Sequence, residues 1–294
     1  MDTERRVVRT SAGVVEVVVR ADAGAPGDTV LYLHGGHESA EAAPACRVYV
    51  ELGRRVVAVS RPGYGGTDVG PLSPADFAPQ IDEVRAALGV DRFTAVVGTS
   101  FGGQQAVQYA VQWPARARSL ILHSAAPSTL PYPDVALQRL LGPVMFHPRV
   151  ERHVWGATRT LMRRAPEVGL RMMLAPLSTV PLATWFPQVT EADRADMRNL
   201  FATMRSGRGF VVDLAHAGAD QGPTRRAAQQ RVACRTLVTG SRHDAGVTWA
   251  HAEDLASTIP RASLVDLGAP SHLFWIGESR TRLREVVDGF LAGV

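Results

Sequence analysis

The sequence predicts an α/β fold, in which a mostly parallel, doubly wound sheet carries a helical cap inserted after its sixth strand. Three observations lead to this prediction. Apolar runs alternate with segments of helical periodicity up to residue 126. The alternation stops at Pro127 and resumes near residue 234. The inner strands are apolar along their whole length, which is typical of a parallel sheet with helices on both faces.

The first part of the chain predicts a hairpin that leads into the alternating sheet. Two β-rich runs, RRVVRT and VVEVVVR, flank a Ser-Ala-Gly turn. Ser73 is expected to cap a helix that Gly89 ends. Strands are then expected within residues 28–36, 54–60, 93–99 and 119–125, and helices over 40–52, 73–89 and 101–113.

The second part predicts helices without strands, followed by a return to the sheet. GATRTLMRRA, TEADRADMRNLFATMR and GFVVDLAHAGAD have helical periodicity and are separated by prolines and glycines. The sheet pattern returns in CRTLVTGSRHD, a helix over 248–258, the strand ASLVDLG and a closing helix from Glu278. We therefore expect a core domain made of residues 1–127 and 232–294, with a helical cap over 128–231.

Length and composition indicate a globular protein. The chain has 294 residues, of which 46% are hydrophobic, and this suits one large domain with an insertion. No stretch approaches the roughly 18 apolar residues of a membrane span, and the first residues lack the apolar core of a secretory signal. We expect no membrane partner and a cytoplasmic location, where Cys46 and Cys234 would be reduced thiols.

Charge excludes some classes of function. All 32 basic residues are arginine, so lysine Schiff-base chemistry and a P-loop lysine are absent. The net charge of +4 is spread in ones and twos, so we expect no nucleic-acid partner. His34 and His37 have no third ligand nearby in the sequence, and no dinucleotide fingerprint follows a first strand. We therefore expect neither a metal nor a cofactor.

The segment AVVGTSFGGQQAV places Ser100 between Gly98 and Gly102, where a strand passes into a helix. A sharp turn of this kind lifts the serine above the sheet and needs small neighbours on both sides. The N-terminus of the following helix favours negative charge at the same point. Ser100 is therefore a candidate nucleophile.

A serine nucleophile needs a base and a carboxylate that orients the base. Asp244 and His272 each follow a predicted strand, so both side chains can reach the sheet edge that carries Ser100. Asp266 lies inside a strand and too close to the histidine, and His243 is expected to pack or cap rather than to catalyse. The chain order Ser, Asp, His is the order of hydrolases with a strand–nucleophile–helix turn.

These motifs together resemble the α/β-hydrolase fold superfamily, of the type with a helical cap after the sixth strand. The resemblance covers nearly the whole chain, although the cap itself matches no known type. Two mild departures are AGVTW after Asp244, where many relatives carry a proline, and Ser271, where relatives often carry glycine. The motifs that carry the resemblance are LHGG, SRPGYGGTD, GTSFGG and the loops of Asp244 and His272.

The resemblance implies a catalytic triad of Ser100, Asp244 and His272. It also implies an oxyanion hole made by the backbone N–H groups of Phe101 and Gly36. A serine in place of an aspartate excludes dehalogenase and epoxide hydrolase chemistry of this fold. The implied reaction is cleavage of an ester, a lactone or a related carbonyl bond in a small, apolar substrate, through an acyl-enzyme.

Three classes of function share this signature. Besides a serine hydrolase, the chain can be a cofactor-free lyase, a cyclase or a C–C bond hydrolase, or a ligand sensor without turnover. The expected partner is a small molecule, and the protein is expected to be a monomer or a homodimer. Large apolar side chains of the cap can form either a pocket roof or the cap's own core. They are Met145, Phe146, Trp155, Met162, Met172, Met173, Trp185, Phe186, Met197, Phe201, Met204 and Phe210.

Overall fold

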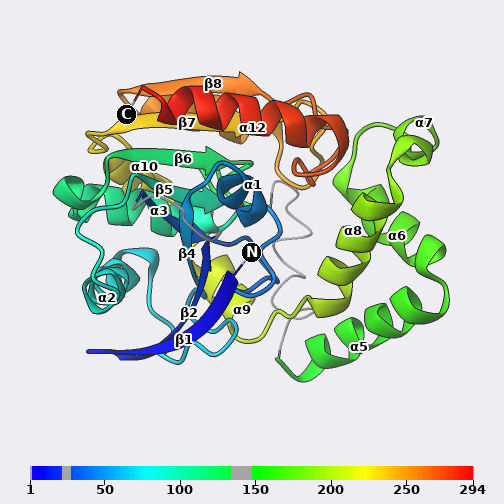
Figure 1. Ribbon diagram of the computed structural model, residues 1–294, viewed down its shortest axis with the longest axis horizontal. Coiled ribbons are helices and arrows are strands. Elements are labelled where there is room, and N and C mark those ends of the chain that lie inside the picture. Colours follow the sequence, from blue (N-terminus) through cyan, green and yellow to red (C-terminus); the bar gives the residue numbers. More distant parts are fainter. Residues whose placement is uncertain (1, 22–27, 134–147, 294) are drawn as a thin grey trace.

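A computed structural model of the protein describes residues 2–21, 28–133 and 148–293. Within these ranges, eight strands form one sheet in the order β1-β2-β4-β3-β5-β6-β7-β8 (Figure 1). β2 is antiparallel to β1 and to β4, and the other neighbours are parallel, which confirms the mostly parallel sheet. The strands are β1 (Asp2–Thr10), β2 (Gly13–Ala21), β3 (Thr29–Leu33), β4 (Arg55–Val59), β5 (Ala95–Thr99), β6 (Ser119–His123), β7 (Arg235–Gly240) and β8 (Ala262–Asp266).

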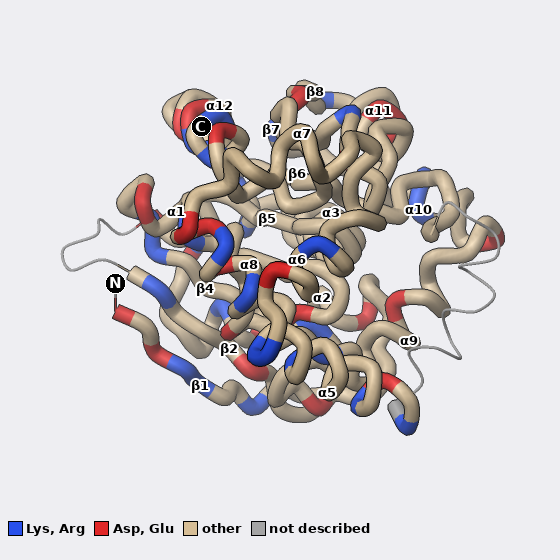
Figure 2. The backbone as a smooth tube through the Cα atoms, turned by 90° about the vertical axis from the view of Figure 1, so that its right-hand side faces the viewer, with Lys and Arg blue, Asp and Glu red and all other residues tan. Residues whose placement is uncertain are grey.

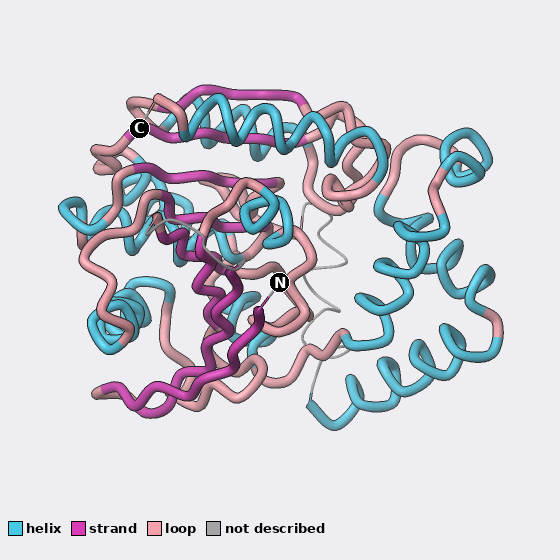
Figure 3. Tube along the Cα trace, in the orientation of Figure 1, coloured by secondary structure: helices cyan, strands magenta, loops and turns pink. Residues whose placement is uncertain are grey.

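Helices cover both faces of the sheet (Figure 3). Successive strand residues point to opposite faces, so in β3 Val30 and Tyr32 face one apolar cluster while Leu31 and Leu33 face another. Helices α1 (Cys46–Glu51) and α12 (Gly277–Leu291) complete the first cluster. The second cluster is completed by α2 (Pro74–Ala87), α3 (Gly102–Gln112) and α11 (Trp249–Thr258). The predicted double winding is confirmed.

Local sequence signals explain where several helices begin and end. Ser73 caps α2, because its Oγ accepts a hydrogen bond of 3.1 Å from the Asp76 N–H. Gly89, at φ 64°, follows the end of this helix. The helix expected over 40–52 is shorter and spans only Cys46–Glu51. Pro44 is the physical reason, since a proline disfavours helical backbone at the residue before it.

The described residues between β6 and β7 form helices and contribute no strand to the sheet. In Figure 1, α5, α6, α7 and α8 lie to the right of the sheet, whereas α10 packs against α3 and α11. The division into a core domain and a cap, with limits at residues 128 and 231, remains a prediction, and the described residues between β6 and β7 are called the cap. The helices between β6 and β7 are α5 (Pro148–Arg164), α6 (Pro166–Leu174), α7 (Leu182–Trp185), α8 (Glu191–Thr203), α9 (Gly209–Ala215) and α10 (Gly222–Gln229). Short 3₁₀ turns lie among them at Ala175–Leu177, Phe186–Gln188 and Ala219–Gln221, and another precedes β6 at Pro114–Arg116.

The apolar side chains of the cap occupy different places. Met162, Trp185, Phe186, Met197 and Phe201 are buried in the cluster that also contains α1 and α12. Cap and core domain therefore share one continuous apolar cluster. Of the remaining cap residues, Met173 and Met204 pack against this cluster and Met172 is exposed. The predicted roof residues Met145 and Phe146 lie outside the described residues.

Acidic and basic residues are interspersed along the described chain (Figure 2). In the described ranges, no helix is both long enough and apolar enough to cross a membrane. Cys46 and Cys234 are both free thiols. Burial raises the pKa of the Cys46 thiol to about 12, so this side chain is an uncharged part of the core.

Candidate active site

Ser100 lies on a strained turn between β5 and α3. Its φ of 50° is in the left-handed region, which non-glycine residues seldom adopt. The turn is held by a hydrogen bond of 3.0 Å from the Ser100 N–H to the carbonyl of His123 at the end of β6. A Cβ on Gly102 would lie 2.2 Å from the Leu33 carbonyl oxygen, and one on Gly98 would lie 2.7 Å from the Gly102 oxygen. Glycines at both positions therefore allow the serine to stand at this turn.

The structure brings His272 and Asp244 together. The His272 Nδ1 lies 2.8 Å from Asp244 Oδ2. The other carboxylate oxygen of Asp244 accepts hydrogen bonds of 2.8 Å from the backbone N–H groups of Gly246 and Val247. Because the carboxylate is buried and fixed by backbone donors, it can hold one orientation of the imidazole and leave Nε2 free.

The charge of Asp244 sets the protonation behaviour of His272. Burial alone would lower the pKa of the imidazole, but the Asp244 carboxylate outweighs it, and Glu38 contributes in the same direction. The resulting pKa is raised above its usual value. The side chain of His272 is 19% exposed, so it can meet a ligand while its partner Asp244, at 1%, cannot.

A short segment of the cap fixes the loops of both residues. The Leu177 carbonyl accepts hydrogen bonds from the N–H groups of Ala245, at 3.2 Å, and His272, at 2.9 Å. Ser178 forms an isolated antiparallel bridge with Asp244. Contacts between the cap and the core domain therefore position the Asp244 and His272 loops relative to each other. This contribution of the cap is not visible in the sequence pattern.

The rejected candidates have other partners. Asp266 ends β8, where its carboxylate accepts a hydrogen bond of 2.9 Å from the Gly268 N–H and lies 3.4 Å from Arg242. The backbone carbonyl of His243 accepts a hydrogen bond of 3.0 Å from the Thr179 N–H. Neither residue contacts the imidazole of His272 in these interactions. Within the described ranges, no group of three His, Cys, Asp or Glu side chains is arranged to hold a metal.

Gly36 and Phe101, the predicted oxyanion donors, lie next to each other. A Cβ on Gly36 would lie 3.3 Å from the Phe101 ring and 3.1 Å from the Phe210 ring of α9. Phe101 is the N-cap residue of α3, so its N–H lies at the positive end of that helix. The absence of a side chain on Gly36 allows the loop after β3 to approach the Ser100 turn closely. Their role as donors remains a prediction.

A buried ion pair ties this loop to the cap. Arg61 is fully buried and forms two hydrogen bonds with the Asp213 carboxylate of α9, at 2.5 and 2.9 Å. Its remaining donors bind the carbonyls of His34, at 2.8 Å, and Gly35, at 2.9 Å. Tyr64 donates a further hydrogen bond of 2.6 Å to Asp213. Arg61 therefore holds the backbone directly before Gly36.

His37 connects the same loop to two other parts of the cap. Its ring stacks on Phe210 with 4.0 Å between centroids, and Nδ1 lies 2.9 Å from the Ser206 Oγ. Burial, helped by the positive charge of Arg61, lowers the pKa of His37 to about 3. The imidazole is therefore neutral, and its Nδ1 can accept from the Ser206 hydroxyl, which in turn accepts from Trp155 Nε1 at 2.8 Å.

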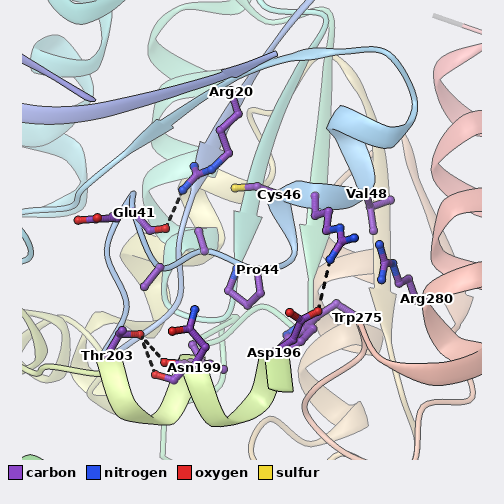
Figure 4. Close-up of a pocket in the computed structure, with 14 residues that line it drawn as sticks. Arg20, Glu41, Pro44, Cys46, Val48, Asp196, Asn199, Thr203, Trp275 and Arg280 are labelled. Atoms are coloured by element: carbon purple, nitrogen blue, oxygen red, sulfur yellow. Dashed lines mark hydrogen bonds and ion pairs between the residues drawn. The ribbon is translucent and has the colours of Figure 1, made fainter. Parts of the chain in front are cut away.

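A groove of about 170 Å³ lies between the 41–48 segment and α8 (Figure 4). An exposed ion pair of 3.5 Å between Arg47 and Asp196 joins its two walls. None of the three predicted triad residues lines it. Its lining consists of Arg20, Glu41, Ala42, Ala43, Pro44, Cys46, Arg47, Val48, Asp196, Asn199, Leu200, Thr203, Trp275 and Arg280.

Comparison with known proteins agrees with this architecture. The family described as alpha/beta hydrolase fold matches residues 28–278. The uncharacterized hydrolase YcgS of Bacillus subtilis (strain 168) is 28% identical over 267 residues, covering 90% of this chain and 92% of that protein.

Two solved structures share the fold over nearly their whole length. An alpha/beta hydrolase fold protein from Nakamurella multipartita has a TM-score of 0.72 at 24% identity, covering 98% of this chain and 99% of that chain. The enol-lactonase from Burkholderia xenovorans LB400 has a TM-score of 0.70 at 18% identity, covering 98% and 100%. With the family match, the strained serine turn and the strand order in agreement, this chain belongs to the alpha/beta hydrolase fold family.

Proposed function

We propose that this protein is a serine hydrolase that cleaves an ester, a lactone or a related carbonyl bond of a small, largely apolar substrate. The hydrogen bond of 2.8 Å between His272 and Asp244 carries the proposal. It joins two loops that follow neighbouring parallel strands, at the sheet edge where Ser100 also lies. Acyl transfer requires an oriented base and a serine nucleophile, and the strand order brings the loops of His272 and Ser100 to the same sheet edge.

In the proposed reaction, the Ser100 Oγ attacks the substrate carbonyl while His272 Nε2 accepts its proton. Asp244 keeps Nδ1 protonated and stabilises the imidazolium that forms. The Phe101 and Gly36 N–H groups bind the oxyanion of the tetrahedral intermediate. His272 then gives the proton to the leaving group, and a water molecule releases the acyl group by the same steps.

The surroundings of the loop support an apolar substrate. Phe101 packs edge to face on Tyr132 and on Phe210, with centroid distances of 5.0 and 5.5 Å. The rings of Phe101 and Phe210 lie next to Gly36. Of the similar proteins, one is named a hydrolase and another an enol-lactonase, and both names agree with cleavage of a carbonyl bond. We propose a monomer or a homodimer in the cytoplasm, acting on a small molecule.

The experiment that tests this function measures hydrolysis of p-nitrophenyl esters from acetate to decanoate. Loss of the nucleophile lowers turnover on the order of a millionfold, so Ser100→Ala should be inactive. Ser124→Ala is the matched control, because Ser124 is also buried at positive φ, and its Oγ finds no hydrogen-bond partner among the described residues.

The two variants separate the classes of function. Activity that Ser100→Ala abolishes and Ser124→Ala retains supports the serine hydrolase. Activity that survives in Ser100→Ala contradicts the proposed nucleophile. Folded wild-type protein without activity on any ester instead favours a C–C hydrolase, a lyase or a sensor.

A further inference from the structure

Glu38 places a second carboxyl group beside the candidate site. It follows His37 on the loop after β3, and its carboxyl carbon lies 4.0 Å from the position that a Cβ would occupy on Gly35. The Ser100 Cβ lies 3.3 Å from that same position. The carboxyl of Glu38 and the side chain of Ser100 are thus neighbours across Gly35, whose lack of a side chain allows this close approach.

Among the described residues, this carboxyl takes part in no ion pair. A backbone hydrogen bond from Gly35 stabilises it. Arg61 is near enough to act through its charge, but its guanidinium donors are directed at Asp213, His34 and Gly35. When it is ionised, this half-buried carboxylate therefore carries a negative charge next to Ser100 that no ion pair among the described residues compensates.

Four titratable or charged groups interact electrostatically with Glu38. Arg61 follows β4, His272 follows β8, Tyr32 lies on β3 and Cys46 begins α1. Burial raises the pKa values of the Tyr32 hydroxyl and the Cys46 thiol, so both are neutral in the physiological range. Burial also raises the pKa of Glu38 to about 7, although Gly35, His272 and Arg61 act against this shift. Glu38 therefore changes its charge near neutral pH.

We propose that Glu38 is a specificity-determining residue of this site, selecting substrates that bring a positive charge or a hydrogen-bond donor next to Ser100. The inference rests on the proposed function, since it assigns a substrate class to the same site. The chemical class is an ester or lactone with an ammonium or hydroxyl group near the reacting carbonyl. A cationic group would supply a counter-ion, whereas a substrate carboxylate would be repelled.

The test compares pairs of esters that have the same shape and differ by one charge. p-Nitrophenyl 4-(trimethylammonio)butanoate and 5,5-dimethylhexanoate carry the difference on the acyl side. Butyrylcholine and 3,3-dimethylbutyl butyrate carry it on the alcohol side. The quantity measured is the ratio of kcat/KM for the cationic ester to kcat/KM for its neutral partner. Effects of a substitution or of pH on the shared chemical step, including ionisation of His272, cancel in this ratio.

For at least one pair, we expect Glu38→Gln to lower the ratio at pH 8.5 at least tenfold. Glu38→Asp, which keeps the charge, should retain part of the preference, and far-UV circular dichroism checks that both variants are folded. At pH 5.5 the wild-type ratio should fall towards that of Glu38→Gln, because the carboxyl is then protonated. Glu41→Gln is the matched control, since its carboxylate is on the same segment but 69% exposed, and it should leave the ratio unchanged. A ratio that is the same within twofold in wild type and Glu38→Gln for both pairs overturns the proposal.

A binding measurement separates failure of this inference from failure of the proposed function. Choline and its neutral isostere 3,3-dimethylbutanol need no turnover, and NMR titration gives the Kd of each. If no ester is hydrolysed, the proposed function fails, but a choline preference that Glu38→Gln lowers tenfold still supports the role of Glu38. If Glu38→Gln leaves that binding preference unchanged as well, the role of Glu38 is refuted.

Discussion

Replacing Asp213 by alanine is expected to destabilise the protein strongly. The change removes the carboxylate that binds Arg61 through two hydrogen bonds of 2.5 and 2.9 Å. Arg61 is 0% exposed and Asp213 is 4% exposed, so water cannot replace the lost partner. The Tyr64 hydroxyl also loses its acceptor. A positive charge is then left buried with only the two backbone carbonyls of His34 and Gly35.

The magnitude follows from this burial. Removing one member of a buried ion pair costs about 3–5 kcal/mol of unfolding free energy, because the remaining charge stays desolvated. Domains are stable by only about 5–15 kcal/mol, so the loss is a large fraction of the total. Urea denaturation, followed by circular dichroism and tryptophan fluorescence, measures it. Coincidence of the two signals checks that unfolding is two-state.

Asp196→Ala is the matched control for Asp213→Ala. Both aspartates lie on cap helices and both face an arginine of the core domain, but the Asp196 pair with Arg47 is 41% and 55% exposed. Exposed pairs contribute about 0–1 kcal/mol, so this variant should remain close to wild type. The reasoning is refuted if Asp213→Ala loses less than about 1 kcal/mol, since the buried pair would then behave like the exposed one.

Two further predictions concern glycine and pH. Gly102→Ala should lower the unfolding free energy by about 3 kcal/mol, because its Cβ would lie 2.2 Å from a carbonyl oxygen. In Gly156→Ala, in α5, the new Cβ meets nothing within 4 Å, so the unfolding free energy should rise by about 0.5–1 kcal/mol. Urea denaturation measures both changes, and equal effects would contradict the packing argument. The proposed reaction needs His272 in its neutral form. Because the pKa of His272 is raised, kcat/KM should fall as the pH drops below that raised value. Asp244→Asn removes the charge that raises this pKa, so in a pH–rate profile the acid limb should move to lower pH, and a limb that stays in place would contradict this cause.

Much of the fold follows from local patterns. The apolar runs, the helix cap at Ser73 and the stop at Gly89 depend on interactions between residues close in the chain, and these are the signals that a sequence displays directly. The turn at Ser100 is recognisable locally, because its two glycines stand within two residues of the serine, although distant backbone at Leu33 and His123 also constrains it. The predicted length of α1 is wrong for an equally local reason, because Pro44 restricts the backbone of the residue before it.

The candidate site is only partly local. Asp244 and His272 are candidates because each follows a predicted strand. Packing between distant segments decides the hydrogen bond between them and places the Leu177 carbonyl that binds both loops. Their catalytic roles remain predictions. The sequence shows Glu38 two positions after the glycine pair, but it does not show where Glu38 lies relative to Ser100.

By itself, the sequence determined the alternating α/β pattern, the place of the helical insertion and the strained serine turn. Tertiary structure alone decided that Arg61 binds Asp213, a partner 152 positions along the chain, and that the Glu38 carboxyl lies beside Ser100 without an ion pair among the described residues. The physical reason is that backbone geometry and hydrophobic periodicity act over a few residues. The pairing and the burial of a charge depend instead on which side chains the finished fold brings together.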